Sequence, residues 1–185
     1  MYSLSRNQQS QQAFLASCQA QGERGEKMIG ETLDSLPPEF LYLENINLCD
    51  KGDIDKVVVG PTGIWTIEVK NHFGGEITFD GKQLLRNGVP FEKDYIKQAW
   101  AEALSVRGLL RKAGFEDCNV QPVICFCYSK VRFGQQKIQG VYVIGSTWLN
   151  DLIENKVEQS LTNYTVESVT ELIRSSSSGG VQKRF

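Results

Sequence analysis

The sequence of 185 residues contains a single histidine, His72. Zinc sites rich in histidine and most Ser-His or Cys-His catalytic arrangements are therefore disfavoured, because every imidazole they need would have to be this one residue. The five cysteines are odd in number and scattered, which suits neither a disulfide framework nor a zinc site. Small buried thiols are the expected role of these cysteines.

The sequence also lacks an apolar run close to the roughly 20 residues that cross a bilayer. Residues 1–12 are polar and Gln-rich, without the charged and apolar regions of a signal peptide. We therefore expect a cytoplasmic protein with no membrane partner. The net charge of −2 demands no nucleic-acid partner, so DNA binding would require a local basic face.

The chain length suits one domain with a real hydrophobic core. We expect a polar lead-in over residues 1–20, a single α/β domain over residues 21–174 and a flexible Ser/Gly tail over residues 175–185. Periodicity and turn signals predict the order helix, three or four strands, helix, two strands and a closing helical part. The helices are expected at 23–36, 93–113, 147–154 and 165–174, and the strands at 39–48, 53–59, 64–70, 76–79, 83–86, 120–128 and 141–144. This order predicts a central mixed β-sheet flanked by helices.

The hairpin predicted over residues 53–70 has charged residues within otherwise apolar strands. Glu68 and Lys70 are two apart in a strand, so they project from one face while their apolar neighbours occupy the other. A half-exposed edge strand would show the same alternation. Asp55, however, lies among Ile and Val on the preceding strand, where a charge is costly unless it is paired or bound to a cation. The antiparallel return brings Asp55 close to Glu68 and Lys70.

Two carboxylates and an ammonium at one end of a hairpin suit a Mg²⁺ or Mn²⁺ site, in which water and substrate phosphate complete the coordination. Such an ion lowers the pKa of a bound water, and Lys70 would orient or deprotonate that water or stabilise the transition state. The backbone carbonyl of Val69 is a further candidate ligand. Asp55, Glu68 and Val69 are thus the hairpin's predicted metal ligands.

A third carboxylate, Glu26, falls on the core-facing stripe of the first predicted helix. Gly25 beside it costs a helix about 1 kcal/mol relative to alanine, and a small residue there would let the helix approach the sheet closely. A solvated first turn rich in glutamate is the alternative interpretation. On the first interpretation Glu26 joins the predicted catalytic residues and metal ligands.

Three segments resemble the nuclease-related domain (NERD) family, which is similar to the PD-(D/E)xK nuclease superfamily of restriction enzymes and archaeal junction resolvases. These segments are GERGEKMIGETLDSL, GDIDKVVVGPTGIWTIEVKN followed by Gly-Gly-Glu-Ile, and KQAWAEALSVRGLL, within residues 22–110. The resemblance implies a restriction-endonuclease-like core and metal-dependent hydrolysis of DNA. It implies that Glu26 is the carboxylate of the first helix, Asp55 the metal-binding aspartate, Glu68 and Lys70 the ExK pair, and Gln98 an accessory polar residue.

Some assignments stay open. Asp53 competes with Asp55 for the metal and is otherwise expected to support the site or the turn. His72 is expected to be a surface residue at the hairpin end rather than a proton shuttle. A basic side for the substrate would include Lys70 and Arg86, together with Lys82, Lys93 and Lys97.

Three functions are compatible with the residues. The first is a Mg²⁺- or Mn²⁺-dependent deoxyribonuclease, which the resemblance favours and for which a homodimer is the candidate assembly. The second is a non-catalytic nuclease-like module that binds nucleic acid or a protein partner. The third is a structural domain in which Glu68 and Lys70 form an ordinary ion pair.

Overall fold

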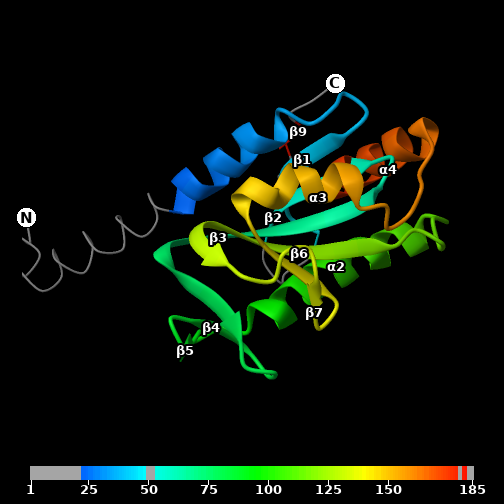
Figure 1. Ribbon diagram of the computed structural model, residues 1–185. Coiled ribbons are helices and arrows are strands. Elements are labelled where there is room, and N and C mark those ends of the chain that lie inside the picture. Colours follow the sequence, from blue (N-terminus) through cyan, green and yellow to red (C-terminus); the bar gives the residue numbers. More distant parts are fainter. Residues whose placement is uncertain (1–21, 49–52, 179–180, 183–185) are drawn as a thin grey trace, which may run out of the picture.

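A computed structural model describes residues 22–48, 53–178 and 181–182 of the protein (Figure 1). The expected lead-in over residues 1–20 lies outside the described residues, as do Cys18 and Cys49. The three remaining cysteines, Cys118, Cys125 and Cys127, are free and buried.

The strands form one sheet. They are β1 (Leu41–Ile46), β2 (Ile54–Gly60), β3 (Gly63–Phe79), β4 (Leu84–Arg86), β5 (Val89–Pro90), β6 (Val120–Val131), β7 (Lys137–Ile138), β8 (Val141–Gly145) and β9 (Val181–Gln182). Their order is β7-β8-β6-β3-β2-β1-β9, and the small β4–β5 hairpin is attached to β3. β6 pairs in parallel with β3 and β8, and the other pairs are antiparallel. The predicted mixed sheet is therefore confirmed.

Helices cover both faces of this sheet (Figure 1). They are a first helix over residues 22–33, α2 (Tyr95–Lys112), the short η1 (Ser146–Trp148), α3 (Leu149–Asn155) and α4 (Asn163–Ser176). The first helix and α3 pack on the face that carries Trp65, in one cluster with Ile29 and Leu152. α2 and α4 pack on the other face, where Val106 and Val169 belong to one buried cluster. This three-layer arrangement is the predicted α/β fold.

The β2–β3 hairpin forms where the turn residues predict it. Gly60 pairs with Gly63, whose φ of 141° is open to glycine and strained for other residues. Thr62 in the turn donates a hydrogen bond from its hydroxyl to the carbonyl of Ile153, 2.5 Å away. The turn is thus fixed to the end of α3, and the hairpin strands run from it towards the candidate site.

β3 differs from the prediction because it does not end at Lys70. It continues through Gly74 and Gly75 to Phe79, so the separate strand expected at 76–79 is wrong. The two glycines have φ values of 63° and 86°, and the pairing with β6 shifts register between Lys70 and Phe73 and again before Glu76. Backbone irregularities of this kind bend a strand without ending it.

The chain end also differs from the prediction. α4 continues to Ser176, two residues into the predicted tail, and Val181–Gln182 forms β9 beside β1. The short strand β7 has no counterpart among the predicted elements. No helix in the described part of the chain has the length and apolar character needed to cross a membrane.

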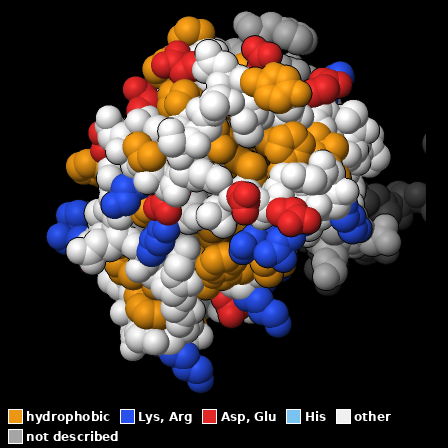
Figure 2. All heavy atoms as spheres, turned by 90° about the vertical axis from the view of Figure 1, so that its right-hand side faces the viewer, with side chains coloured by type: hydrophobic (Ala, Val, Ile, Leu, Met, Phe, Trp, Pro, Cys, Tyr) orange, Lys and Arg blue, Asp and Glu red, His pale blue; other side chains and the backbone are white. Residues whose placement is uncertain are grey.

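Figure 2 shows the side of the molecule that lies at the right of Figure 1, where α4 and the β2–β3 turn are found. Lys and Arg side chains are interspersed there with Asp and Glu side chains, and hydrophobic side chains lie between them. The described residues therefore gather no strong positive potential on this side, which is the end of β3 remote from Lys70.

Candidate functional site

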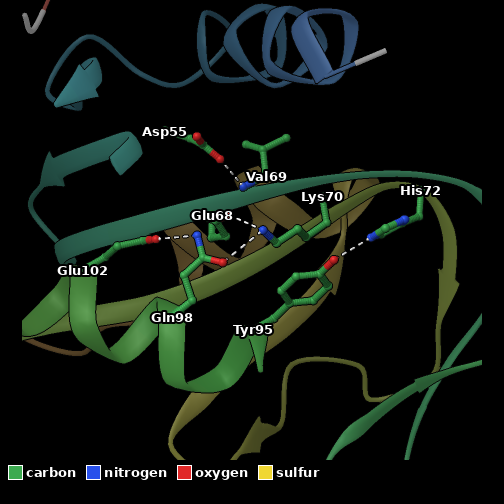
Figure 3. A network of polar contacts seen from close by, with 8 residues as sticks. All are labelled: Asp55, Glu68, Val69, Lys70, His72, Tyr95, Gln98 and Glu102. Atoms are coloured by element: carbon green, nitrogen blue, oxygen red, sulfur yellow. Dashed lines mark hydrogen bonds and ion pairs between the residues drawn. The ribbon is translucent and has the colours of Figure 1, made fainter. Parts of the chain in front are cut away.

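The site begins with the charged face of β3. Glu68 and Lys70 point toward α2, and the Lys70 ammonium contacts Oε1 of Glu68 (Figure 3). Glu68 is 4% exposed, so its charge is almost entirely withdrawn from water. Gln98 on α2 lies across from the pair, and its Oε1 is 3.3 Å from Lys70 Nζ. The structure thus brings Glu68, Lys70 and Gln98 together.

Asp55 approaches the same part of β3 from β2. Its Oδ2 accepts a hydrogen bond from the backbone N–H of Val69 at 2.7 Å (Figure 3). Burial and the negative charge of Glu68 raise the pKa of Asp55 to about 7, against the lowering effects of the Val69 hydrogen bond and Lys70. A carboxyl group in this state loses its proton readily when a cation arrives.

Glu26 reaches the site from the first helix. Its negative charge contributes to the raised pKa of Asp55 and also to that of Cys127 on β6. Gly25 explains how the helix comes so close: an added Cβ there would lie 2.9 Å from Cβ of Asn71 and 3.1 Å from Sγ of Cys127. The close approach expected from this glycine is confirmed.

Glu102 is a further carboxyl group at the site, and the sequence interpretation missed it. It lies one turn after Gln98 on α2, and Gln98 Nε2 donates to its Oε1 at 3.1 Å (Figure 3). Burial, then a hydrogen bond and charge repulsion from Glu68, raise the pKa of Glu102 to about 9. The available signal was the four-residue spacing from Gln98, which places both side chains on one helix face.

The carboxyl groups are short of positive partners. Oε2 of Glu68 and Oε2 of Glu102 are buried and accept no hydrogen bond from an N–H or hydroxyl group, so a proton on Glu102 that bridges to Glu68 is the donor left to them. Buried acceptors of this kind are rare in folded proteins and mark a place for a proton, a water molecule or an ion. The raised pKa values of Asp55 and Glu102 show the same excess of negative charge.

These oxygen donors suit a hard divalent cation that takes only some of its ligands from the protein. No group of three or more His, Cys, Asp or Glu side chains in the described part of the chain is placed to hold an ion unaided. Mg²⁺ is usually bound by one or two carboxylates, with water and substrate oxygens completing its octahedron. Asp55, Glu68 and the carbonyl of Val69 match this smaller set, and Glu26 lies close enough to affect it electrostatically.

Aromatic residues surround Lys70 on its other side. Its Nζ lies 4.1 Å from the ring centroid of Tyr95, whose hydroxyl is 3.0 Å from Nε2 of His72 (Figure 3). His72 also packs near Phe91 and Phe126, and burial lowers its pKa. The expectation of a surface histidine at a hairpin end is therefore wrong, since His72 is half-buried in an aromatic cluster.

The remaining predicted residues lie around this centre. Asp53 is exposed immediately before β2. Lys82, Lys93 and Lys97 are exposed, and Arg86 on β4 is partly buried against β3. Arg86 donates from Nε to the carbonyl of Gly74 at 3.2 Å.

Comparison with known proteins gives one family match. No curated protein and no solved structure matches the chain. The family model described as nuclease-related domain matches residues 21–127, more than half of the chain. The matched range contains the first helix, the hairpin and α2, and so every residue placed at the site above. The chain belongs to the nuclease-related domain family.

Proposed function

We propose that the protein hydrolyses phosphodiester bonds of DNA with the help of Mg²⁺ or Mn²⁺. The observation that carries this proposal is the buried pair of carboxyl groups of Glu68 and Glu102, whose Oε2 atoms accept no hydrogen bond from an N–H or hydroxyl group and which lie next to one lysine. A cation at this position would relieve the repulsion that raises the pKa of Asp55 and Glu102. Family membership supports a nuclease-related role for the domain that contains these residues.

Asp55, Glu68 and the carbonyl of Val69 would hold the ion, with Glu26 and Glu102 adding negative charge nearby. When bound, such an ion lowers the pKa of a coordinated water and offsets charge on the phosphate. These residues come from β2, β3, α2 and the first helix, four elements of the same domain.

Lys70 would supply the protein's own positive charge at the site, in addition to that of the ion. Its ammonium is held by Glu68, by Oε1 of Gln98 at 3.3 Å and by the face of Tyr95 at 4.1 Å. This arrangement orients Nζ to position the attacking water and to stabilise negative charge that develops on the phosphate oxygens. Gln98 then acts as a positioning residue for Lys70.

The test is cleavage of single-stranded and duplex DNA with Mg²⁺, Mn²⁺ or EDTA. Glu68→Ala and Lys70→Ala should each lower the metal-dependent rate by about 100-fold or more, since each removes a group that acts in the transition state. Glu171→Ala is the matched control, because Glu171 is an exposed acid on α4 that pairs with Arg174. Cleavage that survives Glu68→Ala would rule out this site.

A non-catalytic DNA-binding module is the second candidate. It is favoured by the ion pair of Lys70 with Glu68, which already partly neutralises the carboxylate without a metal. In that case DNA binding would be salt-sensitive, would persist in Glu68→Ala, and would be accompanied by no cleavage with any divalent ion.

A further inference from the structure

Two exposed aromatic side chains stack on one another just beyond the candidate site. Phe73 on β3 is 54% exposed and Tyr128 on β6 is 37% exposed. Their ring centroids are 4.3 Å apart and their planes differ by 10°. Large apolar rings exposed in this way bury little surface for the fold, so they are a candidate contact surface for a ligand.

The stacked pair lies next to Lys70 along the same two paired strands. Lys70 pairs with Phe126, and Phe73 pairs with Tyr128, two residues further along β6. The register shift between Lys70 and Phe73 sets three residues of β3 against two of β6. Three residues of strand place the rings roughly 10 Å from Lys70.

Positive charge borders the rings. Arg86 donates hydrogen bonds to the carbonyls of Phe73 and Gly74, which holds its guanidinium beside the stack. Lys130 is exposed and lies two residues after Tyr128, on the same face of β6. Aromatic faces next to basic groups are the combination that proteins use to bind single-stranded nucleic acid.

We infer that Phe73 and Tyr128 form a stacking platform for an unpaired base of the DNA substrate, and that the site prefers DNA with a single-stranded segment. This rests on the proposed function for the identity of the substrate. A paired base is covered by its neighbours in the duplex and cannot lie on the rings.

The test measures binding and cleavage separately. Binding of a fluorescein-labelled single strand, the same strand with abasic sites, and its duplex is followed by fluorescence anisotropy in EDTA, so that no metal-dependent cleavage occurs. Phe73→Ala should weaken single-strand binding about 5- to 100-fold and duplex binding less than about twofold. Phe73→Trp should retain single-strand binding, and abasic sites should reproduce the loss in the unchanged protein.

Tyr164→Ala is the matched control, because Tyr164 is an aromatic residue 79% exposed on α4, which begins beside the β2–β3 turn at the opposite end of β3. The inference is overturned if Phe73→Ala leaves single-strand binding unchanged, weakens both DNA forms equally, or acts no more strongly than Tyr164→Ala. It is supported if the base-dependent loss occurs. If the protein binds DNA in a base-dependent way but does not cleave it with Mn²⁺, the proposed hydrolysis is wrong. The stacking platform formed by Phe73 and Tyr128 is then still supported.

Discussion

Glu102 has the most strongly raised pKa among the carboxyl groups of the site, about 9, because of burial and its contact with Glu68. The folded protein therefore keeps a proton on Glu102 at pH 8, whereas the unfolded chain releases it. Folded stability from this group is complete below about pH 4.5 and is lost as the pH rises towards 9. Glu102→Gln keeps the side-chain shape without this titration. The variant should be more stable than the unchanged protein at pH 8, by on the order of 2 kcal/mol.

Thermal unfolding in EDTA at a series of pH values checks this prediction. The advantage of Glu102→Gln should shrink to nothing as the pH falls towards 4.5. Glu167→Gln on α4 is the control, since Glu167 is an exposed glutamate on a helix remote from the site. A stability difference that stays constant across the pH range would show that Glu102 does not titrate in this way.

Individual site residues could be predicted only where their spacing along the chain shows which side chains share a face. Glu68 and Lys70 follow from strand alternation, and the contact between them is in the structure. Glu102 was missed because a glutamate in a helix is ordinary, and only the sheet packed against α2 gives it a buried partner. The placement of His72 was wrong for a similar reason, since the aromatic residues around it come from distant segments, α2 and β6.

At the scale of elements, the contact between the first helix and the sheet depends on Gly25. Gly25→Ala adds a Cβ within 2.9 Å of Asn71 and 3.1 Å of Cys127 Sγ, so the helix must move away from the sheet. We expect a loss of about 1–3 kcal/mol of stability, which exceeds the gain in helix propensity of about 1 kcal/mol. Denaturant unfolding monitored by circular dichroism measures it.

Gly108→Ala is the matched substitution, because Gly108 lies inside α2 and an added Cβ meets nothing within 4 Å. It should stabilise the protein by about 0.5–1 kcal/mol through helix propensity alone. Equal effects of the two substitutions would mean that Gly25 does not set the helix-to-sheet distance.

Elements defined by local turn chemistry were predicted well. The β2–β3 hairpin follows from Gly-Pro-Thr-Gly, and the strand expected at 83–86 forms as β4, which pairs with β5. The continuity of β3 through Gly74 and Gly75 was not predictable, because local sequence marks a break there. β3 continues past the two glycines because it pairs in parallel with β6, a segment about 50 residues later in the chain. β9 likewise exists only through its pairing with β1.

At the scale of the whole molecule, the site is assembled from distant parts of the chain. The first helix lies on one face of the sheet and α2 on the other, and both reach the same stretch of β3 (Figure 1). The unfolded chain has no such arrangement, so an ion that binds Asp55 and Glu68 together binds the folded state alone. Binding of this kind raises the stability of the entire domain.

We therefore expect Mn²⁺ to raise the melting temperature of the protein, by about 5–10 °C when its concentration is about 100 times the dissociation constant. The ion must displace the proton of Asp55, whose pKa is about 7, so the increase should be larger at pH 8 than at pH 5.5. Glu68→Ala should abolish the increase, while Glu171→Ala should retain it because Glu171 lies on α4 away from the site. An equal Mn²⁺ effect in Glu68→Ala and in the unchanged protein would place the ion elsewhere and would separate the carboxyl cluster from metal binding.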